Sequence, residues 1–153
     1  MIETIRNEKE VEKNIVKVYQ GSCQLKETYN ECQYYMSHNE LKLFYEESFF
    51  SVNTLCVSLQ DYVKTKSLWR MPFLKFNNAV YITKLTIHLF FTEDEFKWLF
   101  SKALLLEERN FKILEKLQNI QVSEELNRIL ASEYNLQQNR IRTLKSILKE
   151  HYS

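Results

Sequence analysis

Apolar side chains recur three and four positions apart along most of the chain, which is the spacing of one face of an α-helix. Residues 2–20 show this pattern first, and Gly21 then stands where a helix C-cap favours glycine. A second, shorter helix is expected over 24–36. A third is expected up to about Lys66, because the sequence "SHNE" at 37–40 is typical of a capping box and an apolar stripe follows it.

The second half of the chain predicts two long helices. The sequence "TEDE" at 92–95 fits another capping box, with Thr92 as the capping residue, and the stripe behind it has one polar break, at Asn110. Ser123 is expected to cap the last helix. Since the connection between the two helices is short, we expect an antiparallel helix hairpin over about 93–120 and 124–151. The apolar face of the last helix is expected at Leu126, Leu130, Leu136 or Gln137, Ile141, Leu144 and Leu148.

The segment 68–91 allows two interpretations. Alternate residues from Tyr81 to Phe91 are mostly apolar, as in a half-buried strand, and Asn77 with Asn78 could form the turn of a short β-hairpin. The other interpretation is a buried helix that starts at Pro72, which suits a first helical turn. A helix would place on one face the residues Phe73, Phe76, Val80, Thr83, Ile87 and Phe90.

Composition favours helices over strands. The chain of 153 residues contains one Gly and one Pro, too few for the many turns of an all-β protein. Its length fits one domain, residues 1–153. We therefore predict a mainly α-helical, compact bundle that ends in the long antiparallel hairpin.

Charge and cysteine content bear on compartment and partners. The formal net charge is +1, so no overall field attracts nucleic acid or an anionic membrane. The longest stretch without a charged residue, Ser48 to Gln60, is 13 residues and too short to span a bilayer. The first residues have no apolar signal core, and the cysteine count of three is odd. We expect a cytoplasmic protein with reduced thiols and no membrane partner.

No catalytic or metal-binding motif in the sequence has the residue spacing that its chemistry requires. Cys23, Cys32, His38 and Cys56 are potential zinc ligands, but the close Cys–Cys pair of structural zinc sites is missing. No acidic residue stands three positions before a histidine, as di-metal bundles require. The adjacent pairs of glutamates, Glu107–Glu108 among them, are interpreted as solvated. We expect no catalytic residue, no metal, no cofactor and no small-molecule substrate, and hence no enzyme.

Nucleic-acid binding is one functional hypothesis. The last helix is rich in glutamine and basic residues, which read base edges and bind phosphates in known complexes. Three- and four-residue spacings place the candidates on one face. These candidate nucleic-acid contacts are Gln138, Arg142, Lys145 and Lys149.

Protein binding is the favoured hypothesis, because aromatic residues make up 14% of the chain and are enriched at protein interfaces. Asn110, at a core position of the apolar repeat, could pair with its copy in a dimer or with Tyr134 or Gln137 of the same chain. The candidate interface residues are Tyr34, Tyr35, Phe49, Phe50, Trp69 and Asn110. We therefore expect a non-enzymatic, protein-binding regulatory module whose partner is another protein or a second copy. The alternative is a small DNA- or RNA-associated regulator that uses its basic last helix.

Overall fold

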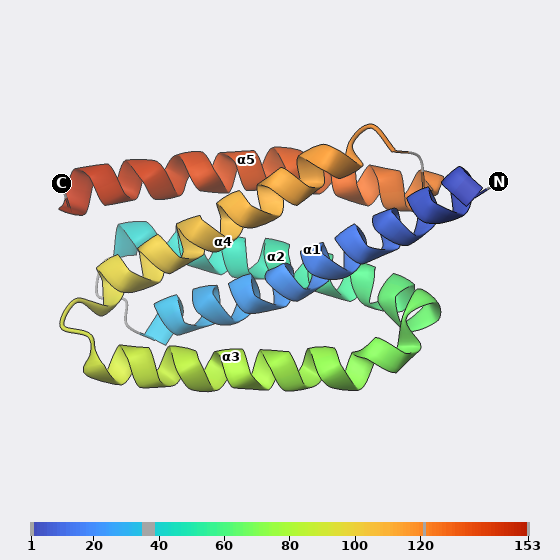
Figure 1. Cartoon of the computed structure of the whole chain (residues 1–153). Helices are drawn as coiled ribbons and strands as arrows, with labels where there is room; N and C mark the ends of the chain where they lie inside the picture. The colour runs from blue at the N-terminus through green and yellow to red at the C-terminus, as the bar shows by residue number, and fades with distance from the viewer. Residues whose placement is uncertain (1, 35–38, 121, 153) are drawn as a thin grey trace.

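The protein is a bundle of helices, as its apolar pattern predicts (Figure 1). The computed structural model describes residues 2–34, 39–120 and 122–152, and no strand occurs among them. The elements in chain order are α1 (Ile2–Tyr34), α2 (Asn39–Lys66), the 3-10 helix η1 (Leu68–Arg70), α3 (Met71–Phe91), α4 (Glu95–Leu117) and α5 (Glu124–Tyr152).

Helix α1 occupies the middle of the bundle. It contacts α2, α3 and α4, while α5 packs mainly on α4 and touches α2 (Figure 1). Fully buried side chains of the core come from all five helices, including Ile15, Leu59, Leu85, Phe100 and Leu144. Helix α3 lies at the edge of the bundle, so only one of its faces is covered.

Gly21 does not end a helix, which corrects the expectation from the sequence. Helix α1 continues through it without a break, so the separate helix expected over 24–36 is the second half of α1. Its φ angle is not positive, as a left-handed C-cap would need. The absence of a side chain at Gly21 leaves room for the Asn110 side chain of α4, because a Cβ added at Gly21 would collide with Asn110 Oδ1.

The segment 68–91 is helical, so the β-hairpin interpretation is wrong. A helix forms, as in the other interpretation, but it starts at Met71 and is not buried: on the predicted apolar face, Phe73, Phe76, Ile87 and Phe90 are exposed. Pro72 stands in the first turn of α3, where its missing N–H costs no hydrogen bond. The buried face of α3 packs towards α1, and the hydroxyl groups of Thr28 and Tyr81 are 2.6 Å apart across this contact. This face consists of Met71, Leu74, Leu85 and Leu89.

The helix ends agree with the sequence in part. Ser123 caps α5 as predicted, because its Oγ accepts a hydrogen bond from Leu126 N at 3.1 Å. The cap of α4 is Asp94 and not Thr92: Asp94 Oδ1 accepts from Lys97 N at 3.0 Å. Two residues of the other predicted capping box, at 37–38, lie outside the described residues.

Candidate functional site

A buried cluster of charged side chains lies between α4 and α5. Glu107 of α4 is 0% exposed and Arg140 of α5 is also buried. Arg140 Nε donates to Glu107 Oε1 at 2.6 Å, and Arg140 Nη2 donates to Glu107 Oε2 at 3.3 Å and to Glu133 Oε1. Gln137 Nε2 donates to Glu107 Oε2 at 2.7 Å. One guanidinium group thus bridges two buried carboxylates.

Two further helices join this cluster. The hydroxyl of Tyr29 in α1 donates to Glu107 Oε1 at 2.7 Å, and Arg140 Nη1 donates to Ser51 Oγ of α2 at 3.1 Å. The charged cluster therefore links α1, α2, α4 and α5. Hydrogen bonds to charged groups are directional and strong in a buried site, so they fix the helices relative to one another.

Burial and charge shift the acidity of the cluster. Burial raises the pKa of Glu133 above its ordinary value, although the positive charge of Arg140 acts in the opposite direction. For Arg140, burial alone would lower the pKa, but Glu107 and Glu133 outweigh it and raise the pKa. Burial and the negative charge of Glu107 raise the pKa of Tyr29 well above its ordinary value. Arg140 therefore stays charged, and the arrangement suits a structural tie between helices.

This cluster is absent from the predictions made from the sequence. The prediction that Glu107 is solvated beside Glu108 is wrong, because Glu107 is buried. The sequence signal for the cluster lies in α5, where the alternating four- and three-residue spacing of the buried positions continues through polar residues. Leu136 is exposed, and the buried face consists of Leu126, Leu130, Glu133, Gln137, Arg140, Leu144 and Ile147.

The cysteines are distributed over the core. Cys32 is buried, and burial raises the pKa of its thiol. Cys23 of α1 and Cys56 of α2 share a side-chain hydrogen bond, which is the main cause that lowers the pKa of Cys23. His38 lies outside the described residues. Within the described ranges, no three His, Cys, Asp or Glu side chains are placed to hold a metal ion.

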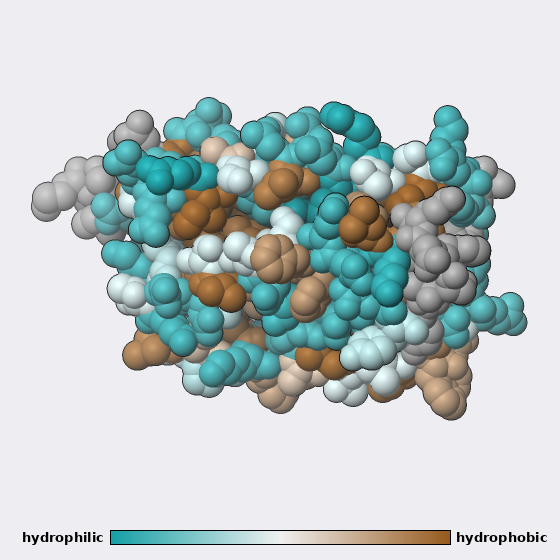
Figure 2. Space-filling model, turned by 180° about the vertical axis from the view of Figure 1, so that it is seen from behind, coloured by the Kyte–Doolittle hydropathy of each residue, from teal (hydrophilic) through white to brown (hydrophobic). Residues whose placement is uncertain are grey.

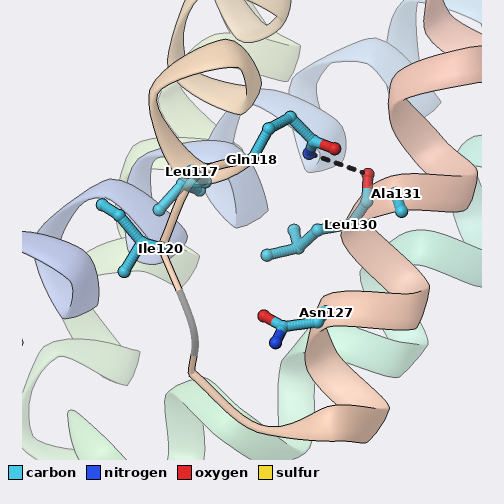
Figure 3. Close-up of a pocket in the computed structure, with 6 residues that line it drawn as sticks. All are labelled: Leu117, Gln118, Ile120, Asn127, Leu130 and Ala131. Atoms are coloured by element: carbon cyan, nitrogen blue, oxygen red, sulfur yellow. Dashed lines mark hydrogen bonds between the residues drawn. The ribbon is translucent and has the colours of Figure 1, made fainter.

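A shallow pocket of about 220 Å³ lies near the connection between α4 and α5 (Figure 3). Gln118 Nε2 donates to the carbonyl oxygen of Leu130 at 3.5 Å across it. The lining consists of aliphatic side chains and two amides, from Leu117, Gln118, Ile120, Asn127, Leu130 and Ala131. It offers no ionisable group for acid, base or nucleophilic chemistry.

The four candidate nucleic-acid contacts are all exposed along α5. Arg142 and Lys149 form no ion pair within the described part of the chain. Lys145 differs, since its Nζ lies 3.3 Å from Glu108 Oε1 of α4. Arg140, on the same helix, points into the core and is not available to a phosphate.

The candidate interface residues divide into two groups. Tyr34, Phe50 and Trp69 are exposed, on α1, α2 and η1 respectively. Phe49 is half-buried against the core, and Asn110 is 2% exposed. Tyr35 lies outside the described residues. Asn110 packs against Gly21, and its Nδ2 has no hydrogen-bond partner within the described part of the chain. The Tyr134 ring stacks on Phe111, and Gln137 donates to Glu107.

A larger apolar surface runs along the outer side of η1 and α3, and we call it the outer stripe. Its members recur at 4-3 spacing, and its five large apolar residues are 53–82% exposed. Figure 2 shows hydrophobic residues along the lower edge of the molecule, where α3 lies in Figure 1. The outer stripe consists of Trp69, Phe73, Phe76, Val80, Thr83, Ile87 and Phe90.

Comparisons with known proteins give no match: no protein family, curated protein or solved structure is significantly similar to this chain. None of the helices in the described ranges is both long enough and apolar enough to cross a membrane.

Proposed function

We propose that the chain is a non-enzymatic module that acts by binding another protein. The observation that supports this most is the outer stripe, which leaves large aromatic side chains in water although the bundle has buried its core. The largest apolar patch of a typical monomer is about 300–600 Å², and such patches are often binding sites. Because the stripe follows one helix at 4-3 spacing, it suits a helical partner.

The rest of the bundle serves as a rigid support for α3 in this proposal. Contacts between α4 and α5 join Gln118 to Leu130 and Phe111 to Tyr134, as expected for an antiparallel helix pair. The charged cluster then ties this pair to α1, on which α3 packs.

Affinity capture with matched variants tests the proposal. Phe73→Ser combined with Phe76→Ser removes two exposed rings of the outer stripe, and Leu43→Ser removes an exposed apolar side chain from α2 as the control. We expect the control to retain the proteins bound by the wild type and the double variant to lose them. Identical capture by all three proteins would refute the proposal.

Nucleic-acid binding through α5 is the second candidate function. It is favoured by the exposure of Gln138, Arg142, Lys145 and Lys149 on one helix. If α5 binds phosphates, affinity falls steeply with salt, and Arg142→Glu with Lys145→Glu abolishes it. A mobility-shift assay at low salt that shows no complex would exclude this function.

A further inference from the structure

We infer that the outer stripe binds an acidic amphipathic helix of another protein. This inference rests on the proposed function, and it adds the secondary structure and the charge of the partner. Three features carry it: the area of the stripe, the charge of the segment around it, and the distribution of side-chain size along it.

The exposed area is large enough for a stable complex. The four aromatic residues of the stripe and the adjacent Phe91 are each at least 64% exposed. An aromatic side chain offers about 150–250 Å², so these five rings expose roughly 700 Å². A standard interface buries about 800 Å² on each partner. The stripe together with Phe91 thus provides most of the apolar surface that one interface needs.

The charged residues of the segment that carries the stripe are all basic. Between Asp61 and Glu93 the sequence contains five basic residues and no Asp or Glu. On α3, Lys75 and Lys84 flank the stripe on opposite sides by helical spacing, and the Arg70 guanidinium lies 4.7 Å from the centre of the Trp69 ring. A partner with Asp or Glu beside its apolar face is therefore complementary.

The same charges disfavour a second copy of this chain. If two α3 helices paired through the stripe, each copy would bring the same basic segment, which contains no Asp or Glu, to the interface. Like charges brought together across an interface are destabilising.

Side-chain size favours a helix over a lipid surface. Bulky rings stand at both ends of the stripe, whereas Ala79, Val80 and Thr83 in the middle are small. The Thr83 hydroxyl already donates to the carbonyl oxygen of Ala79 at 3.0 Å, so it needs no other acceptor. Side chains of a partner helix can fill the space above small residues, as in knobs-into-holes packing, and a flat membrane surface cannot.

Two synthetic peptides of about 21 residues test the inference. Both carry leucines at 4-3 spacing, and they differ only in the flanking residues, which are Glu in one and Lys in the other. We expect the Glu peptide to bind wild-type protein at least about tenfold more tightly than the Lys peptide, by fluorescence anisotropy. Its affinity should fall with added salt, because the charges lie at the exposed rim.

Variants locate the binding and its charge preference. Phe73→Ser with Phe76→Ser should weaken binding of the Glu peptide at least about tenfold, and the Leu43→Ser control should not. Lys75→Glu with Lys84→Glu should reverse the preference, so that the Lys peptide binds more tightly. Both sets of substitutions are on exposed positions, and circular dichroism checks that the helices remain.

Several outcomes would overturn the inference. Equal affinity for the two peptides, absence of binding, or no response to the lysine reversals would exclude an acidic helix. Binding to phosphatidylserine vesicles without binding to either peptide would show that the stripe binds a membrane. A dimer in light scattering that becomes a monomer in the Phe73→Ser, Phe76→Ser variant would show that the stripe binds a second copy. If the captured proteins still depend on Phe73 and Phe76, the proposed function stands without this inference.

Discussion

The contact between Gly21 and Asn110 sets how closely α1 and α4 approach. Gly21 has no side chain, and the amide of Asn110 occupies the space that a Cβ would take. The Asn110 Nδ2 atom is buried and has no hydrogen-bond partner within the described part of the chain. The sequence shows a glycine and an asparagine 89 positions apart, and nothing local pairs them. Their relation follows only from the crossing of the two helices.

Gly21→Ala should therefore destabilise the protein. In a helix interior, Ala is normally better than Gly by about 0.5–1 kcal/mol. Here the new Cβ would collide with Asn110 Oδ1, so we expect overpacking to lower the free energy of unfolding by about 1–3 kcal/mol. Urea denaturation measures the change in the free energy of unfolding.

The matched experiment repeats the change in the Asn110→Ala background. Removing the amide removes the obstacle, so Gly21→Ala should then stabilise the protein by up to about 1 kcal/mol. If Gly21→Ala has the same effect in both backgrounds, the close contact does not determine the choice of glycine.

Glu133 should make stability depend on pH. Burial raises its pKa in the folded chain, so above about pH 4.5 the folded protein holds this proton longer than the unfolded chain does. Stability contributed by the protonated group is therefore lost as pH rises through the folded pKa. Between about pH 4.5 and the pKa of Glu133 in the folded chain, we expect the free energy of unfolding to fall more steeply with rising pH for wild type than for Glu133→Gln. The exposed Glu125→Gln serves as the control, and equal slopes for wild type and Glu133→Gln would contradict the assignment.

At the level of elements, the periodic pattern predicts helices well and their ends less well. Helix α5 starts at Glu124 as expected, since Ser123 is a strong local cap. Its buried face differs from the apolar prediction, because it includes the polar residues Glu133 and Arg140, and Gln137 in place of its alternative Leu136. Polar side chains become good core residues only when Glu107 and Tyr29 supply partners from other helices. Local sequence contains no such information.

The cap of α4 can be tested by two substitutions. Asp94 accepts the Lys97 amide, so Asp94→Ala should cost about 0.5–2 kcal/mol of stability. Thr92, which the sequence suggested instead, bonds to the carbonyl oxygen of His88 on α3, and Thr92→Ala should cost less than about 0.5 kcal/mol. Thermal denaturation of both variants gives the comparison. A larger loss for Thr92→Ala would restore the original capping box.

Across the whole molecule, the charged cluster should contribute strongly to stability. Arg140→Leu leaves Glu107 and Glu133 buried without a positive charge, which typically costs about 3–5 kcal/mol. Arg142→Leu, two residues further on an exposed position, should change stability by less than about 0.5 kcal/mol. Chemical denaturation of the two variants compares them directly. Similar losses of stability in Arg140→Leu and Arg142→Leu would mean that Arg140 is exposed to solvent and not buried.

The helical bundle as a whole was predictable from the sequence, and the exposed position of the outer stripe was not. The 4-3 spacing of Phe73, Phe76, Val80, Thr83, Ile87 and Phe90 indicated a helix face, and the natural expectation is that such a face is buried. In the structure, α3 uses the opposite face, with Leu74 and Leu85, to pack towards α1. Two apolar faces on one helix compete for a single neighbour, and only the tertiary arrangement decides which one remains exposed.

Site-specific photo-crosslinking tests most directly whether the chain binds another protein through the outer stripe. A benzophenone amino acid replaces Phe76 on α3 in one protein and Arg142 on α5 in another, and both are irradiated in extracts of the native host. If the outer stripe is the binding surface, position 76 gives discrete protein adducts and position 142 gives none. Adducts from position 142 alone, whether with nucleic acid or with protein, would contradict it.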